Sequence, residues 1–574
     1  MKHFVTYALL FLAPAIGFSQ TPQPKKFTLT GSARGLLYGD RMDQETAVPD
    51  TVTASRLSSG HTLVDLGLVV RPNDAMEVFG MLRVRNDFGG FWGGGTTFDV
   101  RQLYIRGVVN KKIRYQLGDF NYKLTPFTLY NDDEELSFGR TAALQQYMDV
   151  VNYDNFYDFQ NSWRQQGAAV DFGLTFKRYV DGMNFNLFTS RVNRTNFGGV
   201  SERLFSALSV EILQSKHLTF AANYVNLYDW AGTSRSTVFF RNPVITGLAA
   251  FNYGNEKIKF DARAEVGQSK QFYEGSDIAP ELSGGFSDVS VNLHYRPLES
   301  YAKLTLRNVE ADFRSPGAQS KRINFGAIPA AYQRITNEQV LRPFTLYDLL
   351  RETDLYNLQL SSNLQAFDPR YDNITPYGDA TPNRSGFIVE AGRNDDAERY
   401  QVALRYAGFS ELRGQGTLLS KQFTRLEAET RIHVNRFFAD YEKKIVVDAA
   451  YRNDQTSRDG EEGVRAVDLN SQVLNLGLEV EFARKLSAVL GYQDLQYGGF
   501  DYLPLRAAFD EIVFFNEYEV DGSETMLALG LRYTFSDTDH LSVQWNRYNS
   551  TNNAGGLIPN YTIDQLAFLY VMKF

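Results

Sequence analysis

The chain has 574 residues, a hydrophobic content of 43% and a formal net charge of −8. It contains no cysteine, which excludes a disulfide scaffold, a thiolate zinc or iron–sulfur site and a cysteine nucleophile. The apolar content is too high for a disordered chain, and the slight acidity argues against a general nucleic-acid binder.

The first 19 residues have the order of a secretory signal peptide. Lys2 supplies a positive charge, residues 4–16 are apolar, and Gly17 and Ser19 are the small residues before a cut at Gln20. We therefore expect export from the cytoplasm. After this segment no run of 18 uncharged apolar residues occurs, so the sequence predicts no transmembrane helix. A soluble exported protein and a membrane barrel both remain open at this point, because in lipid only helices and closed barrels satisfy every backbone group.

Strict alternation of apolar and polar residues begins near Phe27, after a short spacer at 20–26, and recurs along the chain. It is clearest in 256–266, 288–296, 425–435 and 474–482, and predicts strands with one apolar and one polar face.

Connections of two kinds separate these segments. Turn-forming residues make short connections at 72–74, 110–112, 181–182, 254–255, 296–299, 394–396, 484–485 and 536–539. Longer connections fall at 39–60, 88–97, 121–166, 268–284, 313–384, 454–467 and 498–522. Short turns at one end and long loops at the other predict an all-β, transmembrane antiparallel β-barrel of about 22 strands, within a range of roughly 18 to 24. Residues 355–365 are either one more strand or part of a folded loop.

The C-terminus ends in an alternating aromatic and apolar pattern formed by Phe568, Tyr570, Met572 and the terminal Phe574. It resembles the signal by which outer-membrane barrels are recognised for insertion, which implies the barrel assembly machinery as a partner. The chain from 27 to 574 resembles, in style, a Bacteroidota-type outer-membrane β-barrel of porin-like design from a Gram-negative cell. Because the first strand follows the spacer directly, we expect no N-terminal plug domain of the kind that TonB-dependent transporters carry.

The long loops at 121–166 and 313–384 share a pentapeptide, Pro-Phe-Thr-Leu-Tyr, at 126–130 and 343–347. The repeat indicates either matching elements that fold over or into the pore, or chance and simple loop packing.

Charged residues on the polar faces are the candidates for lining a pore. They are Arg83, Arg85, Lys257, Lys259, Asp261, Arg263, Lys303, Arg307, Arg425, Glu427, Glu429, Arg431, Glu479 and Glu481. Such residues form either charge rings that select solutes or a salt-bridged wall without selectivity, and the mixed signs favour neither cations nor anions.

Catalytic and metal-binding patterns are weak. His540 and Ser542 share a strand face, as in outer-membrane phospholipases, but no third residue that would orient the histidine is evident. The histidines are spread without metal-ligand spacing, so we expect no enzyme, no cofactor and no metal site.

The sequence thus predicts a porin-like channel for small polar solutes in the outer membrane, with its long loops as candidate gates. The alternative is a non-conducting barrel that serves as a subunit of a secretion, gliding or surface-assembly complex. Outer-membrane lipids and outer-membrane proteins are the expected partners, and nucleic acid is not.

Overall fold

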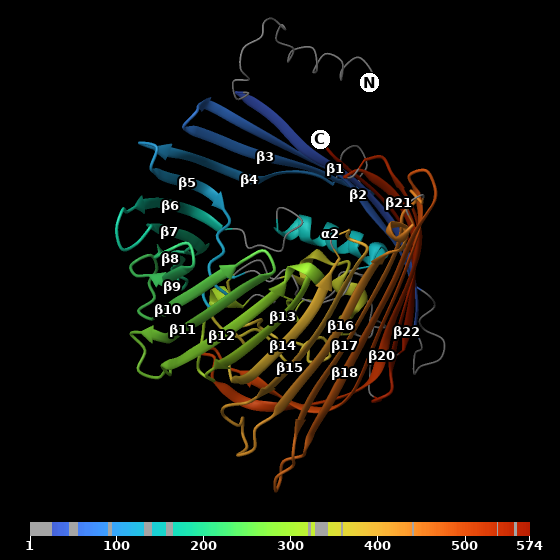
Figure 1. Ribbon diagram of the computed structural model, residues 1–574. Coiled ribbons are helices and arrows are strands. Elements are labelled where there is room, and N and C mark those ends of the chain that lie inside the picture. Colours follow the sequence, from blue (N-terminus) through green and yellow to red (C-terminus); the bar gives the residue numbers. More distant parts are fainter. Residues whose placement is uncertain are drawn as a thin grey trace, which may run out of the picture.

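The computed structural model describes residues 26–44, 55–89, 95–130, 141–156, 165–319, 323–325, 327, 343–356, 360–395, 397–438, 441–536, 538–555 and 560–574. The predicted signal peptide, residues 1–19, and most of the spacer lie outside these ranges. Within them the chain forms one sheet of 22 strands in which consecutive strands pair antiparallel, and β1 pairs with β22 to complete the ring (Figure 1). The predicted fold class and strand number are therefore confirmed.

The strands are β1 (Phe27–Gln44), β2 (Ser55–Asn73), β3 (Met76–Asp87), β4 (Thr96–Val109), β5 (Ile113–Phe120), β6 (Gln165–Thr175), β7 (Gly182–Asn193), β8 (Glu202–Leu213), β9 (Leu218–Trp230), β10 (Phe239–Gly254), β11 (Ile258–Glu274), β12 (Leu282–Tyr295), β13 (Ser300–Val309), β14 (Arg384–Asn394), β15 (Tyr400–Ser410), β16 (Gln422–His433), β17 (Ile445–Arg458), β18 (Val467–Ala483), β19 (Leu486–Arg506), β20 (Ile512–Thr534), β21 (His540–Asn552) and β22 (Tyr561–Lys573). Their lengths differ greatly, from 8 residues in β5 to 23 in β20, so the wall is much taller on one side.

The outer face of the wall changes character partway along the long strands. On β18, Leu476 and Leu478 point outward and are more than a third exposed, whereas Asn475 and Glu479 on either side of them are buried on the inner face. At about 3.3 Å per residue and a tilt of about 40°, the outward apolar residues from 474 to 482 span roughly 20–25 Å, the thickness of a membrane band.

Beyond this band the two faces exchange polarity. On β18, Asp468 is exposed while Leu469 and Val473 are buried inside the barrel. The reversal lies at the same height on the next strand, because Gln472 pairs with Gln496 and Leu476 pairs with Tyr492. β18 and β19 therefore continue past the membrane band with a polar exterior and a largely apolar interior.

Three of the predicted long connections are much shorter than expected as a result. The structure replaces 268–284, 454–467 and 498–522 by connections of 275–281, 459–466 and 507–511. The prediction was wrong there because the residues beyond the membrane band are mostly polar and were taken for loop, although the strands continue through them.

Two of the expected long loops remain and lie inside the barrel. The first, between β5 and β6, contains α2 (Ala142–Phe156), which Figure 1 shows within the ring of strands. The second, between β13 and β14, contains η2 (Pro316–Ala318), α3 (Leu346–Leu349) and η3 (Thr353–Leu355). Residues 353–356 thus belong to a folded loop: Tyr356 forms only an isolated bridge, to Ile323. The remaining short helices, η1 (Arg296–Leu298) and η4 (Val434–Phe437), lie in connections between strands. Neither α2 nor any other helix in the described ranges is long and apolar enough to cross a membrane.

Candidate channel lumen

Both copies of the repeated pentapeptide are buried inside the barrel. In the first copy, Phe127 stacks on Phe286 of β12 with ring centroids 3.9 Å apart. The carbonyl of Thr128 accepts a hydrogen bond from Ser315, and Tyr130 N–H donates to the carbonyl of Gly317, so the first loop is joined to the second. In the second copy, Thr345 and Asp348 form a capping box at the start of α3. The two loops therefore form one body, here called the lumenal plug (described residues of 121–156 and 310–383).

Buried ion pairs hold the plug to the wall. Arg370 donates to Asp368 at 2.6 Å and to Glu524 of β20 at 3.1 Å, and Glu524 also accepts the backbone N–H of Leu346 at 2.8 Å. Burial by itself would raise the pKa of the Asp368 carboxyl, but the Arg370 guanidinium and the Tyr518 hydroxyl hold that pKa below its usual range. These anchors were missed at the sequence level because Arg370 and Glu524 are 154 residues apart and lie in no local pattern.

Neutral hydrogen bonds hold α2. Gln146 donates to the side-chain oxygen of Gln544 on β21 at 2.6 Å and accepts from the Ser542 hydroxyl at 2.8 Å. Asn546, further along β21, donates to Tyr147 at 2.9 Å. Ser542, the residue of the possible phospholipase-like pair, is thus 2% exposed and is committed to fastening α2.

Three of the candidate pore-lining residues lie under the plug. Arg83 pairs with Asp65 at 2.7 Å and contacts Asp154 of α2, Arg307 pairs with Asp288 and with Asp379 of the plug, and Arg425 pairs with Asp454 and with Asp372 of the plug. These arginines join the wall to the plug.

Other candidates form an alternating ladder across neighbouring strands on the inner wall. Lys303 of β13 lies opposite Glu390 of β14, and Arg405 of β15 bridges Glu390 at 3.1 Å and Glu427 of β16 at 3.4 Å. Elsewhere on the inner wall, Arg263 pairs with Glu265, Lys259 with Asp261, Arg85 with Asp87, and Glu479 with Lys444. Lys257 lies in the short turn between β10 and β11. Glu481 lies near the end of β18, where it accepts the backbone N–H groups of Lys444 and Lys485.

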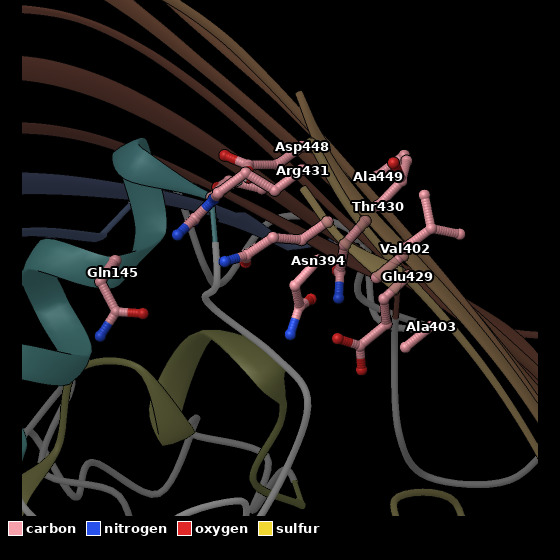
Figure 2. Close-up of a pocket in the computed structure, with 13 residues that line it drawn as sticks. Gln145, Asn394, Val402, Ala403, Glu429, Thr430, Arg431, Asp448 and Ala449 are labelled. Carbon is pink, nitrogen blue, oxygen red and sulfur yellow. Dashed lines mark hydrogen bonds and ion pairs between the residues drawn. The ribbon is translucent and has the colours of Figure 1, made fainter. Parts of the chain in front are cut away.

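A cavity of about 250 Å³ opens at the periplasmic end of the lumen, between the first turn of α2 and β14–β18 (Figure 2). The candidates Glu429 and Arg431 line it together with Asp448, which pairs with Arg431 at 2.5 Å. Figure 2 shows Gln145 of α2 on one side of this space and Asn394 of β14 on the other. A second cavity, of about 290 Å³, lies against the later turns of α2 and is lined by Arg34, Asp149, Tyr153, His540 and Lys573 among others. No group of three or more acidic or histidine side chains suited to a metal occurs in the described part of the chain.

The residues of the expected insertion signal lie on the outer face. Phe568, Tyr570 and Phe574 are between 37% and 50% exposed, as expected for side chains that meet lipid. Phe574 also exchanges two backbone hydrogen bonds with Gly31 of β1, at 2.7 and 2.9 Å, and completes the contact between the first and last strands.

No protein-family model and no curated protein matches the chain. Solved structures of outer-membrane porins are similar to it in fold. A BenF-like porin from Pseudomonas fluorescens Pf-5 is 12% identical, with 80% of this chain and 99% of that chain covered and a TM-score of 0.37. OprD from Pseudomonas aeruginosa is 7% identical, with 95% of this chain and 94% of that chain covered and a TM-score of 0.38. OccK2 (OpdF) from the same organism, solved in complex with glucuronate, is 11% identical, with 78% of this chain and 96% of that chain covered and a TM-score of 0.38. These identities and TM-scores are too low to indicate a shared function.

Proposed function

We propose that this protein is a porin-like channel of the bacterial outer membrane that passes small polar solutes through a lumen narrowed by the plug. The observation that carries the proposal is the contrast between the two faces of the wall. An apolar outer band meets lipid, while the inner wall at the same height carries charged and amide side chains beside cavities of about 250 and 290 Å³.

The periplasmic half of the lumen supports a water-filled passage. The ladder residues Glu390, Arg405 and Glu427 are 14–38% exposed although they lie inside the barrel. Charged side chains at this exposure require water, because the interior of a dry barrel would be packed with uncharged side chains. Most of the apolar core of the plug lies towards the extracellular end, and α2 extends from it into the periplasmic half beside the two cavities, so the plug narrows the lumen without filling it.

Purified protein reconstituted in planar lipid bilayers tests the proposal. We expect discrete conductance steps in KCl, and osmotic swelling of vesicles that contain the protein when a small polar solute is added. Folding is checked independently by the retarded mobility of the unheated barrel in detergent gels. A folded barrel that neither conducts nor admits solutes would contradict the proposal and would favour a structural role in a larger outer-membrane complex.

Insertion through the assembly machinery is part of the same proposal. The outward position of Phe568, Tyr570 and Phe574 supports it, because these side chains are accessible while β22 is still unpaired on one edge. Removing Phe574 is expected to lower the amount of assembled barrel in outer-membrane fractions, whereas Phe438→Ala, in an exposed periplasmic turn, serves as the control.

A further inference from the structure

The cavity between α2 and β14–β18 has a lining that is suited to one class of solute. We propose that it is a binding subsite on the channel path for a neutral, multiply hydroxylated solute of about the size of one sugar ring. This inference rests on the proposed channel function and adds a substrate class to it.

Amide side chains reach into the cavity from several elements. Gln145 comes from α2, Asn394 from β14, Gln401 from β15 and Asn475 from β18. Asn394 and Gln401 are direct cross-strand partners, so their side chains are neighbours on the inner face. An amide offers both donors and an acceptor, as does each hydroxyl of a sugar, so several amides around one space match adjacent hydroxyl groups in either hydrogen-bonding sense.

The ionic groups of the lining leave no net positive charge. Arg431 and Asp448 are paired at 2.5 Å, and Glu429 lies on the same face of β16 as Arg431 (Figure 2). The lining therefore holds one cationic and two anionic side chains, which disfavours an anionic solute by like-charge repulsion in a confined space. Carboxylate and guanidinium groups that are already paired still hydrogen-bond to hydroxyls, because each has several donors or acceptors.

Small residues provide the space. Ala403 and Ala450 lie directly opposite Glu429 on the two neighbouring strands, so no bulky side chain fills the wall on either side of the carboxylate. The resulting volume of about 250 Å³ corresponds to roughly eight water molecules at about 30 Å³ each. A solute that displaces these waters must replace their hydrogen bonds, and a ring bearing several hydroxyl groups does so.

Vesicle swelling with three probes of matched size tests the charge preference. Glucose, glucosamine and glucuronate share one sugar ring and differ chiefly in charge, and we expect glucose and glucosamine to enter roughly tenfold faster than glucuronate. In bilayers, glucose added to KCl should bind transiently and increase the current noise. Glu429→Gln should bring the glucuronate rate closer to the glucose rate.

The double variant Asn394→Leu, Gln401→Leu tests the amides. Because one lost hydrogen bond is worth about 1 kcal/mol, we expect the glucose concentration for half-maximal block to rise about fivefold or more. The matched control is Asn252→Leu, an exposed amide near the periplasmic end of β10, which lies outside the cavity and should leave the glucose response unchanged.

The KCl conductance recorded in the same membranes separates the two proposals. If the channel conducts but glucuronate enters as fast as glucose, or the double variant responds to glucose like the parent protein, the proposed subsite is contradicted and the proposed channel function is not. If the folded protein does not conduct at all, the proposed channel function is contradicted and the subsite falls with it.

Discussion

At the scale of single residues, the plug depends on a few buried charges whose partners lie on the wall. Arg370 and Glu524 are 7% and 0% exposed, and each also contacts other buried groups. Removing one partner of a buried pair of this kind lowers the stability strongly, because the remaining charge has no water around it.

Replacing Arg370 by Met should therefore loosen the plug without unfolding the barrel. We expect a local destabilisation of about 3–5 kcal/mol, since Asp368 and Glu524 would be left buried without their cation. The chain has no cysteine, so Ala380→Cys, at a site that is 7% exposed, gives a clean reporter. Thiol labelling of this reporter should be much faster in the variant. Arg436→Met, which removes an ion pair in a periplasmic turn, is the control, and equal labelling rates in all three backgrounds would contradict the role of Arg370.

The depressed pKa of Asp368 predicts how the plug responds to acid. A carboxyl whose pKa is lower in the folded protein contributes stability above its unfolded value of about 3.9, and that stability is lost as the pH falls through the folded pKa. Single-channel conductance should accordingly stay constant from about pH 8 to 5 and change only below about pH 4. Asp368→Asn should show the altered conductance already at neutral pH. A conductance change centred near pH 6 would assign the acid response to other groups.

At the scale of elements, α2 is held by amides and hydroxyls along much of its contact with β21, whereas its C-terminal end is held by charge. Arg34 of β1 donates to Asp154 at 2.7 Å, and the Tyr153 hydroxyl donates to Asp65 of β2 at 2.5 Å. The helix is therefore fixed most firmly at its C-terminal end.

Gln146→Leu should release the middle of α2. The substitution leaves Ser542 and Gln544 with unmatched polar groups inside the barrel, at a cost of about 1–3 kcal/mol. A cysteine at Ala143, which is 0% exposed, should then be labelled roughly tenfold faster or more. Gln472→Leu changes an amide on the outer face and should leave the labelling rate unchanged. If Gln472→Leu raises the labelling rate as strongly as Gln146→Leu, the cysteine reports on the stability of the whole barrel rather than on α2.

At the scale of the whole molecule, the reversal of polarity along the long strands sets the membrane boundary. Leu478 lies within the apolar outer band, whereas Gln472 points outward on the same strand beyond it. Leu478→Arg should reduce the free energy of folding into vesicles by about 2–4 kcal/mol, and Gln472→Arg should change it little. Folding titrations in lipid vesicles measure both, and equal penalties would place the boundary elsewhere.

The sequence predicted the barrel well because alternation is a local property. The residues of 474–482 alone show one apolar and one polar face, and the structure confirms this assignment for β18. The end of the preceding strand was misjudged: residues 454–458 are all polar and were taken for a loop, although they continue β17 beyond the membrane band.

The plug could be foreseen only as a possibility. The repeated pentapeptide marked both loops, but their place inside the barrel depends on contacts between distant positions, such as Arg307 with Asp379 and Asn373 with Asp501. The alternation of polar and apolar residues along a strand does not predict such contacts between distant residues. Likewise, Glu429 and Arg431 were recognised as inward-facing candidates, whereas the amides that share their cavity belong to four separate segments.

The plug also reaches across the junction where the first and last strands meet. Tyr347 donates to Asp40 of β1 and accepts from Gln565 of β22, and α2 contacts Ser32 of β1 as well as Gln544 of β21. Side-chain hydrogen bonds from the plug thus join the first and last strands from inside the barrel, in addition to the backbone hydrogen bonds between these strands. Sideways opening of the wall at this junction would have to break these hydrogen bonds first, which disfavours a lateral path between the lumen and the bilayer.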